Sequence, residues 1–382
     1  MCEHAEFVFR SAAAGGESRS RGASGVIRRG GIRGWITRRW VCRSSKSWSR
    51  CSFRYDPRSG FPHLEKSALM IAARTVRLIA PSGYPVDPVA VERGIGRLRA
   101  AGHRVDGVEV ARRQMQRFAG TDDQRLADIN QLADPSQPLP DIVLAVRGGY
   151  GASRLLADLD YAGLQKRLAG TGTAFVGHSD FTAIQLALLA RAGLVTFGGP
   201  MLTAHFGAEK LETYTWDAFW RTLSEPVTTL RFDTPQIDTV EAKGTLWGGN
   251  LALVVALIGT PYMPQIDGGI LFLEDVNEPP FRIERMLYQL HHAGILARQQ
   301  AVILGEFTEY RLATHDNGFT LDSMIAHLRS KFGIPFLTGL PFGHVARILT
   351  LPVGAPAELS ADASGFTLSF SGYPYKESNS SA

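Results

Sequence analysis

The main part of this sequence is informative first through what it lacks. All three cysteines among the 382 residues lie before residue 71, at Cys2, Cys42 and Cys51. Residues 71–382 therefore hold no disulfide framework, no thiolate nucleophile and no cysteine metal site. The sequence also has no apolar run that approaches the ~20 residues needed to cross a bilayer. We therefore expect no membrane partner.

The net charge of +5 conceals two different parts of the chain. Residues 1–70 carry 14 Lys/Arg and 5 Asp/Glu, a balance of +9, whereas residues 71–382 carry 27 and 31, a balance of −4. Because nucleic-acid surfaces are basic, the mildly acidic body does not predict a nucleic-acid partner.

Residues 1–70 are rich in Arg, Ser and Gly and have no sustained period of 2 or 3.6. They also lack the apolar stretch of a secretory signal. We interpret them as a disordered basic leader or as an extension upstream of the natural start. A transit peptide and a basic nucleic-acid arm are the alternatives.

From Thr75 onward, short apolar segments alternate with amphipathic ones. This rhythm predicts an N-terminal α/β domain over residues 71–222, with three layers and a parallel sheet covered by helices on both faces. The expected strands are 75–80, 104–110, 141–146, 174–176 and 195–197. The expected helices are 88–101, one that begins after Thr121 with Gln124 as its capping-box partner, 152–159 and 180–191.

Residues 223–243 interrupt this rhythm with Pro226, Pro235 and several Thr and Asp. We interpret them as the crossover to a second domain, residues 244–382. Its expected helices are 251–258, 281–293 and 321–332, and its expected strands are 270–273, 301–304, 348–351 and 366–370. The short final strands predict a mixed α/β domain with a partly antiparallel or barrel-like sheet.

A serine between a strand and a helix carries the main chemical signal. Residues 175–181 read Phe-Val-Gly-His-Ser-Asp-Phe, with the serine at 179. A serine at such a turn projects beyond the sheet, as in a nucleophile elbow, and the helix N-terminus favours an oxyanion. The N–H of Asp180 is a candidate oxyanion donor. The pattern matches Gly-x-Ser-x-Gly only in its first half, and the alternative is that Ser179 or Asp180 merely caps the helix.

A glycine-rich segment follows the preceding expected strand. Residues 147–151 read Arg-Gly-Gly-Tyr-Gly, and Gly149 is our candidate for a second oxyanion donor or a substrate-binding position. Neither a dinucleotide fingerprint nor a P-loop fits this segment, so we expect no nucleotide cofactor. The adjacent His291 and His292 lack the spacing of a His-Glu-x-x-His site, and we expect no metal.

A nucleophilic serine needs a base, and the base needs an orienting acid. His344 follows Pro-Phe-Gly in an expected loop and is a reasonable base, whereas His178 would point to the other side of the turn. Glu274 ends an apolar strand and is a candidate acid, with Asp275 and Glu278 as competitors.

Seven motifs in order, across about residues 75–358, resemble the LD-carboxypeptidase family. They are Ile79-Ala80-Pro81-Ser82-Gly83, Arg147-Gly148-Gly149-Tyr150-Gly151, Gly177-His178-Ser179-Asp180, Gly198-Gly199-Pro200-Met201, Trp247-Gly248-Gly249-Asn250, Leu273-Glu274-Asp275 and Gly343-His344.

The resemblance implies a Ser–His–Glu triad, which the family pattern places on Ser179, His344 and Glu274. It implies that the N-terminal domain carries the serine and the C-terminal domain the other two, with the cleft between the domains. It also implies release of terminal D-alanine from cell-wall tetrapeptides, in the cytoplasm, during murein recycling, by a homodimer.

A nucleotide-dependent enzyme ranks well below a peptidase, and two further alternatives remain. A related branch of the family cleaves a peptide-nucleotide antibiotic for self-immunity, although the Leu-Glu-Asp-Val-Asn-Glu wording around Glu274 is closer to the recycling branch. A non-catalytic binder of wall peptides on the same fold is the other. The presence of all three triad residues argues against a binder, because binding alone does not require a complete triad.

Overall fold

The computed structural model describes residues 40–44, 47–51 and 72–378. The chain divides into two units, Met1–Asp56 and Pro57–Ala382. In the first unit, β1 (Trp40–Ser44) and β2 (Ser47–Cys51) form an antiparallel pair, which the sequence does not predict. The remaining prediction for residues 1–70 lies outside the described residues.

The first sheet of the second unit has six strands in the order β13-β7-β6-β5-β3-β4. Its parallel strands are β3 (Thr75–Ile79), β4 (Arg104–Asp106), β5 (Ile142–Ala145), β6 (Ala174–Gly177) and β7 (Thr196–Gly198). Every residue of β5 and β6 is buried, as expected for parallel strands that are covered on both faces. The predicted parallel sheet of the N-terminal part is therefore confirmed.

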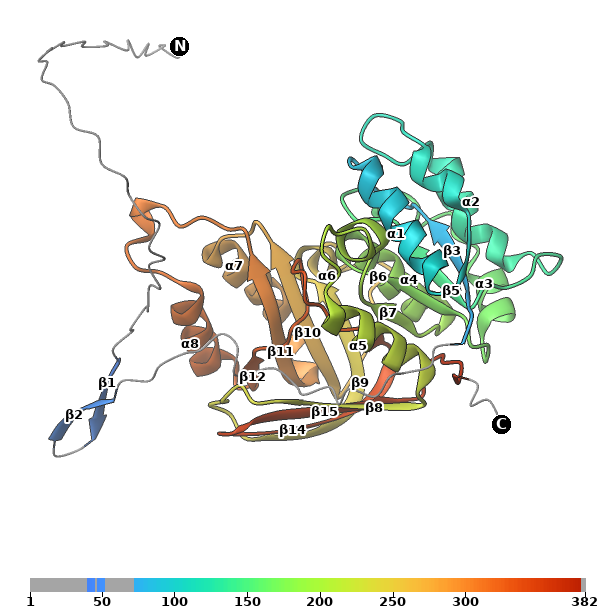
Figure 1. Cartoon of the computed structure of the whole chain (residues 1–382). Coiled ribbons are helices and arrows are strands. Elements are labelled where there is room, and N and C mark those ends of the chain that lie inside the picture. The colour runs from blue at the N-terminus through green and yellow to red at the C-terminus, as the bar shows by residue number, and fades with distance from the viewer. Residues whose placement is uncertain (1–39, 45–46, 52–71, 379–382) are drawn as a thin grey trace, which may run out of the picture. The chain divides into compact units, whose positions relative to one another are not determined.

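Five α-helices accompany the first sheet along the chain (Figure 1). They are α1 (Pro88–Ala100), α2 (Asp122–Asn130), α3 (Tyr161–Leu168), α4 (Thr182–Ala192) and α5 (Thr213–Ser224). The predicted capping box is present at α2, where Gln124 N donates to Thr121 Oγ1 at 3.2 Å and Thr121 N donates to Gln124 Oε1 at 3.0 Å.

The second sheet has seven strands in the order β12-β11-β10-β9-β14-β15-β8. They are β8 (Val227–Phe232), β9 (Val240–Asn250), β10 (Gly269–Val276), β11 (Gln299–Thr308), β12 (Phe336–Thr338), β14 (Ala355–Asp362) and β15 (Gly365–Ser371). The long strand β9 joins two halves: residues 246–250 run parallel to β10, and residues 240–246 run antiparallel to β14. The sheet is therefore mixed and partly antiparallel, as predicted.

Three α-helices belong to this part of the chain: α6 (Leu251–Ala256), α7 (Pro280–His292) and α8 (Leu321–Phe332). Figure 1 shows α7 and α8 beside the parallel strands β10 and β11. Across the described ranges, no helix combines the length and the apolar character that a membrane crossing requires.

Four local predictions differ from the structure. The expected strand at 104–110 ends at Asp106, and Val108–Arg112 forms the 3-10 helix η1 instead, after Gly107 in the left-handed region. Residues 152–159 form a short 3-10 turn, η3 (Ala152–Arg154), rather than a helix, and α3 begins later because the Asp160 side chain accepts from Gly163 N at 2.8 Å. Residues 223–243 contain β8 and the start of β9 instead of a plain connection. Pro226 and Pro235 flank the six-residue strand β8, so this segment has the composition of a loop.

The fourth difference concerns the expected strand at 348–351. The structure forms β13 (Leu351–Val353) there, and it pairs antiparallel with β7 of the first sheet. The chain thus returns from the second sheet to the first before it continues into β14. This return brings the segment just before β13, which includes His344, close to the carboxyl end of β6.

Candidate active site

A chain of two hydrogen bonds joins the serine, histidine and glutamate that the sequence analysis singles out. Ser179 Oγ lies 2.9 Å from His344 Nε2, and His344 Nδ1 lies 2.8 Å from Glu274 Oε2. An ionised carboxylate only accepts hydrogen bonds, so Nδ1–H donates to Glu274 and Nε2 is free to accept the serine proton. This is the geometry that a serine nucleophile, its base and an orienting acid require.

Three different parts of the fold supply these side chains. Ser179 opens the short helix η4 (Ser179–Phe181) two positions after the end of β6, and Glu274 lies near the carboxyl end of β10. His344 lies in the loop between β12 and β13. The carboxyl end of β6 in the first sheet and that of β10 in the second sheet therefore lie close together, and the loop that carries His344 contacts both.

Ser179 occupies a strained turn. Its φ is 62°, in the left-handed region that non-glycine residues rarely adopt. The Phe181 ring is fully buried and lies 2.6 Å from the position of a Cβ on Gly177, so Gly177 has room only for hydrogen. Phe181, which stands at the position of the second glycine of the usual pattern, thus packs over the first glycine of the elbow.

The capping alternative for this turn does not hold. The residue before η4 is His178, and no side-chain hydrogen bond caps the helix. The Asp180 carboxylate instead accepts from Ser82 Oγ at 2.6 Å and from Ala152 N at 2.8 Å. Asp180 therefore connects the turn that holds Ser179 to two neighbouring loops, a role that the sequence analysis misses.

The glycine-rich segment 147–151 lies against the serine. A Cβ on Gly148 would come within 2.8 Å of Ser179 Oγ. Gly149 has a φ of 109°, which favours glycine. Among the described residues, no acceptor is found for the backbone N–H groups of Gly149 and Asp180. Both donors are therefore available to a ligand beside Ser179.

Glu274 is fully buried and has a second partner. Asn250 Nδ2 donates to Glu274 Oε1 at 3.1 Å and to Asp275 Oδ1 at 2.9 Å. Asp275 also accepts from Ala252 N at 2.9 Å, and Glu278 pairs with Arg282 at 3.5 Å. The two competing acids are thus engaged elsewhere, and only Glu274 reaches the histidine.

Opposing effects set the charge of the base. Burial alone would lower the pKa of His344, but the hydrogen bond and charge of Glu274, together with the charges of Asp275 and Glu309, raise that pKa above its ordinary value. Burial raises the pKa of Asp275 to about 6. The negative carboxylates of the second sheet therefore stabilise the imidazolium that forms when His344 takes a proton.

Comparisons with known proteins agree with this geometry. Residues 76–199 match the model of the LD-carboxypeptidase N-terminal domain, and residues 243–359 match that of the LD-carboxypeptidase C-terminal domain. The chain is also 30% identical over 289 residues to the probable murein peptide carboxypeptidase of Bacillus subtilis (strain 168), which covers 75% of this chain and 88% of that protein. The chain belongs to the LD-carboxypeptidase family.

Two solved structures extend the comparison. The muramoyltetrapeptide carboxypeptidase of Oxalobacter formigenes is 43% identical, with a TM-score of 0.73 over 78% of this chain and 99% of that one. MccF in complex with glutamyl sulfamoyl guanosine is 22% identical, with a TM-score of 0.70 over 80% of this chain and all of that one. The second likeness shows a shared fold alone. The two family matches and the Bacillus subtilis relative make this chain an LD-carboxypeptidase, a serine-type carboxypeptidase by family.

The other histidines near the site of this LD-carboxypeptidase are buried in the protein. His178 lies against the His344 ring, with ring centroids 5.2 Å apart, and its Nδ1 lies 2.9 Å from Gly199 O. Burial holds the pKa of His178 well below its ordinary value, so this ring stays neutral. Within residues 72–378, no group of three or more His, Cys, Asp or Glu is arranged to hold a metal ion.

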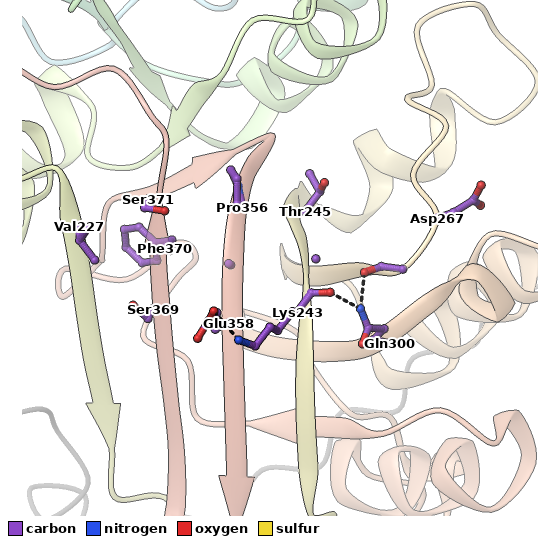
Figure 2. Close-up of a pocket in the computed structure, with 13 residues that line it drawn as sticks. Val227, Lys243, Thr245, Asp267, Gln300, Pro356, Glu358, Ser369, Phe370 and Ser371 are labelled. Carbon is purple, nitrogen blue, oxygen red and sulfur yellow. Dashed lines mark hydrogen bonds and ion pairs between the residues drawn. The ribbon is translucent and has the colours of Figure 1, made fainter.

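A hollow of about 700 Å³ lies elsewhere on this LD-carboxypeptidase, on the second sheet (Figure 2). Its lining includes Lys243, which pairs with Glu358 at 2.8 Å, and Gln300, which donates to Gly268 O at 2.7 Å. None of the triad residues lines it. The hollow shares no residue with the site around Ser179.

Proposed function

We propose that this protein hydrolyses the amide bond between an L-configured centre and a terminal D-amino acid, and that it releases D-alanine from murein tetrapeptides during peptidoglycan recycling. The hydrogen-bonded chain from Ser179 through His344 to Glu274 carries the proposal. The names of the Bacillus subtilis and Oxalobacter formigenes proteins support this choice of substrate.

The reaction begins with attack by Ser179 Oγ on the scissile carbonyl carbon while His344 Nε2 takes the serine proton. Glu274 stabilises the resulting imidazolium. The carbonyl oxygen becomes an oxyanion, and the free N–H groups of Gly149 and Asp180 are the donors that we assign to it. His344 then gives its proton to the amine of the leaving amino acid, and the acyl group stays on the serine.

A water molecule completes the turnover. His344 takes one proton from the water as its oxygen attacks the acyl carbon, and then returns that proton to Ser179 Oγ as the ester bond breaks. The products are a shortened peptide with a new carboxylate and the free terminal amino acid. No cofactor enters any of these steps.

A comparison of three substrates tests the proposal. The purified protein is incubated separately with a murein tetrapeptide that ends in D-alanine, with the same peptide ending in L-alanine, and with an aminoacyl sulfamoyl nucleotide. We expect release of alanine from the first substrate alone. Preferred cleavage of the nucleotide compound would assign the protein to the self-immunity branch, and binding of all three without cleavage would make it a wall-peptide binder.

The resemblance to the family also leads us to propose a cytoplasmic location and a homodimer. Light scattering of the purified protein measures its mass in solution, and a mass of one chain at micromolar concentration contradicts the dimer. Fractionation of the cells that produce it tests the location.

A further inference from the structure

We propose that Arg147 binds the terminal carboxylate of the peptide and so restricts the enzyme to cleavage of the last residue. This proposal rests on the proposed function, because it names the group that selects a free carboxyl terminus. A carboxypeptidase must recognise that carboxylate close to its nucleophile. Only the amide nitrogen and one Cα separate the carboxylate from the scissile carbonyl carbon, a span of roughly 4 Å.

The position of Arg147 meets this requirement. It directly precedes Gly148, which packs against Ser179, and a guanidinium nitrogen of Arg147 lies 3.6 Å from the position of a Cβ on Gly149. Its guanidinium carbon lies 3.7 Å from the corresponding position on Gly83. The cation is therefore held between two glycine turns, beside the assigned oxyanion donor.

Most N–H donors of the Arg147 guanidinium have no acceptor among the described residues. It is half-buried, and its one hydrogen bond to a described residue runs from Nη1 to Tyr84 O at 2.9 Å. A guanidinium has five N–H donors. Within residues 72–378, no carboxylate lies within 4.0 Å of it. A planar cation with free donors matches a carboxylate in both charge and shape.

Nearby arginines in the part of the chain that forms the first sheet and its helices have other partners. Arg125 is fully buried and bonds to Gly151 O at 3.0 Å and to Asp122, which also pairs with Arg154 at 2.6 Å. Arg113 pairs with Asp128. Arg117 is exposed and lies over the Tyr150 ring at 5.4 Å. These contacts leave Arg147 as the half-buried cation beside the serine that lacks a carboxylate partner among the described residues.

The opposite wall of the site has the opposite charge. Glu274 Oε2 lies 2.8 Å from His344 Nδ1, Asp275 follows Glu274 on β10, and Glu309 directly follows β11. The charges of these three carboxylates raise the pKa of His344. A substrate carboxylate is repelled from that wall and attracted to the wall that carries Arg147. The charges therefore favour one orientation of the peptide, with its terminus toward Arg147.

A pair of substrates separates carboxylate binding from a structural role. We would compare kcat/KM for a murein tetrapeptide with a free terminal carboxylate and for the same peptide with a terminal carboxamide. The wild-type protein should prefer the free acid. Arg147→Gln should reduce kcat/KM for the acid by roughly 10- to 100-fold, the range for loss of a charge-assisted hydrogen bond. It should change cleavage of the amide by less than about threefold, and Arg147→Lys should recover part of the preference.

Two controls accompany this comparison. Arg117→Gln removes a neighbouring exposed cation and should keep the wild-type ratio of acid to amide cleavage. The rate at which an uncharged phosphonyl fluoride labels Ser179 should be the same in Arg147→Gln and wild type, which shows that the triad is intact.

The outcomes distinguish the two proposals. An unchanged ratio in Arg147→Gln, or a ratio lost in Arg117→Gln instead, overturns the assignment of Arg147 while alanine release still supports the function. Failure of the wild-type protein to cleave either peptide contradicts the proposed function and the assignment together.

Discussion

Gly148 and Ser179 are packed so closely that the glycine has no space for a side chain: a Cβ on Gly148 would lie 2.7 Å from Ser179 Cβ. The backbone of Gly148 lies outside the left-handed region, so alanine is conformationally allowed there. Gly148→Ala should therefore act by displacing the serine. We expect kcat/KM to fall by roughly 100-fold, since a shift of about 1 Å in a catalytic group has this effect.

Gly96→Ala is the matched control for this variant. A Cβ on Gly96 meets nothing within 4 Å, and Gly96 lies inside α1. We expect unchanged activity and a gain in stability of about 0.5–1 kcal/mol, as for other helical glycines replaced by alanine. Equal activity of Gly148→Ala and wild type would mean that the glycine segment does not fix Ser179.

The orienting acid is tested by two conservative changes. Glu274→Gln keeps the shape of the side chain but removes the charge that holds the His344 tautomer, and kcat should fall by roughly 10⁴-fold with little change in KM. Glu278→Gln removes an acid that pairs with Arg282 and should change kcat by less than about threefold. Steady-state kinetics measure both constants. If Glu274→Gln lowered kcat only slightly while Glu278→Gln lowered it strongly, the acid of the triad would have to be reassigned.

The acidic limb of the pH profile follows from the charges around the base. His344 must be neutral to accept the serine proton, so kcat/KM should fall as the pH drops through its raised pKa. Glu309 contributes to that rise, and Glu309→Gln removes a negative charge that favours the imidazolium. The acidic limb should therefore move to lower pH. Glu358→Gln, which removes an exposed carboxylate on β14, should leave it in place, and equal shifts in both variants would rule out a local effect.

Residues 1–70 lie outside both family matches, the first of which begins at residue 76. We propose that catalysis requires only the part of the chain after them. A protein that begins at Met70 should have the kcat/KM and the melting temperature of the full chain. Melting curves and kinetics on the two proteins compare them directly. A large loss of either quantity would show that the first 70 residues contribute to the enzyme.

Local patterns in the sequence predict most of the secondary structure but not the long-range contacts. The apolar runs at β3, β5 and β6 and the capping box at Thr121 are visible because they depend on neighbouring residues. The strand β8 is missed because Pro226 and Pro235 flank it. The pairing of β13 with β7 is missed because no local signal marks a return to an earlier sheet.

The same limit applies to the candidate site. The candidate base and acid emerge from strand ends and loops, and the family resemblance selects among them. The supporting contacts do not emerge, because Ser82 and Asp180 are 98 positions apart and Asn250 and Glu274 are 24 apart. Each of these residues lies in one of the seven family motifs, but a motif does not show which residue its side chain contacts.

The most direct test of the account is a mass analysis of a murein tetrapeptide after incubation with the wild-type protein and with Ser179→Ala. The wild-type protein should convert the peptide to a product that is shorter by its terminal alanine. Ser179→Ala should leave the peptide intact, because loss of the nucleophile in a serine triad costs on the order of 10⁶ in kcat. Alanine release by Ser179→Ala within tenfold of the wild-type rate, or an intact peptide with the wild-type protein, would contradict the account.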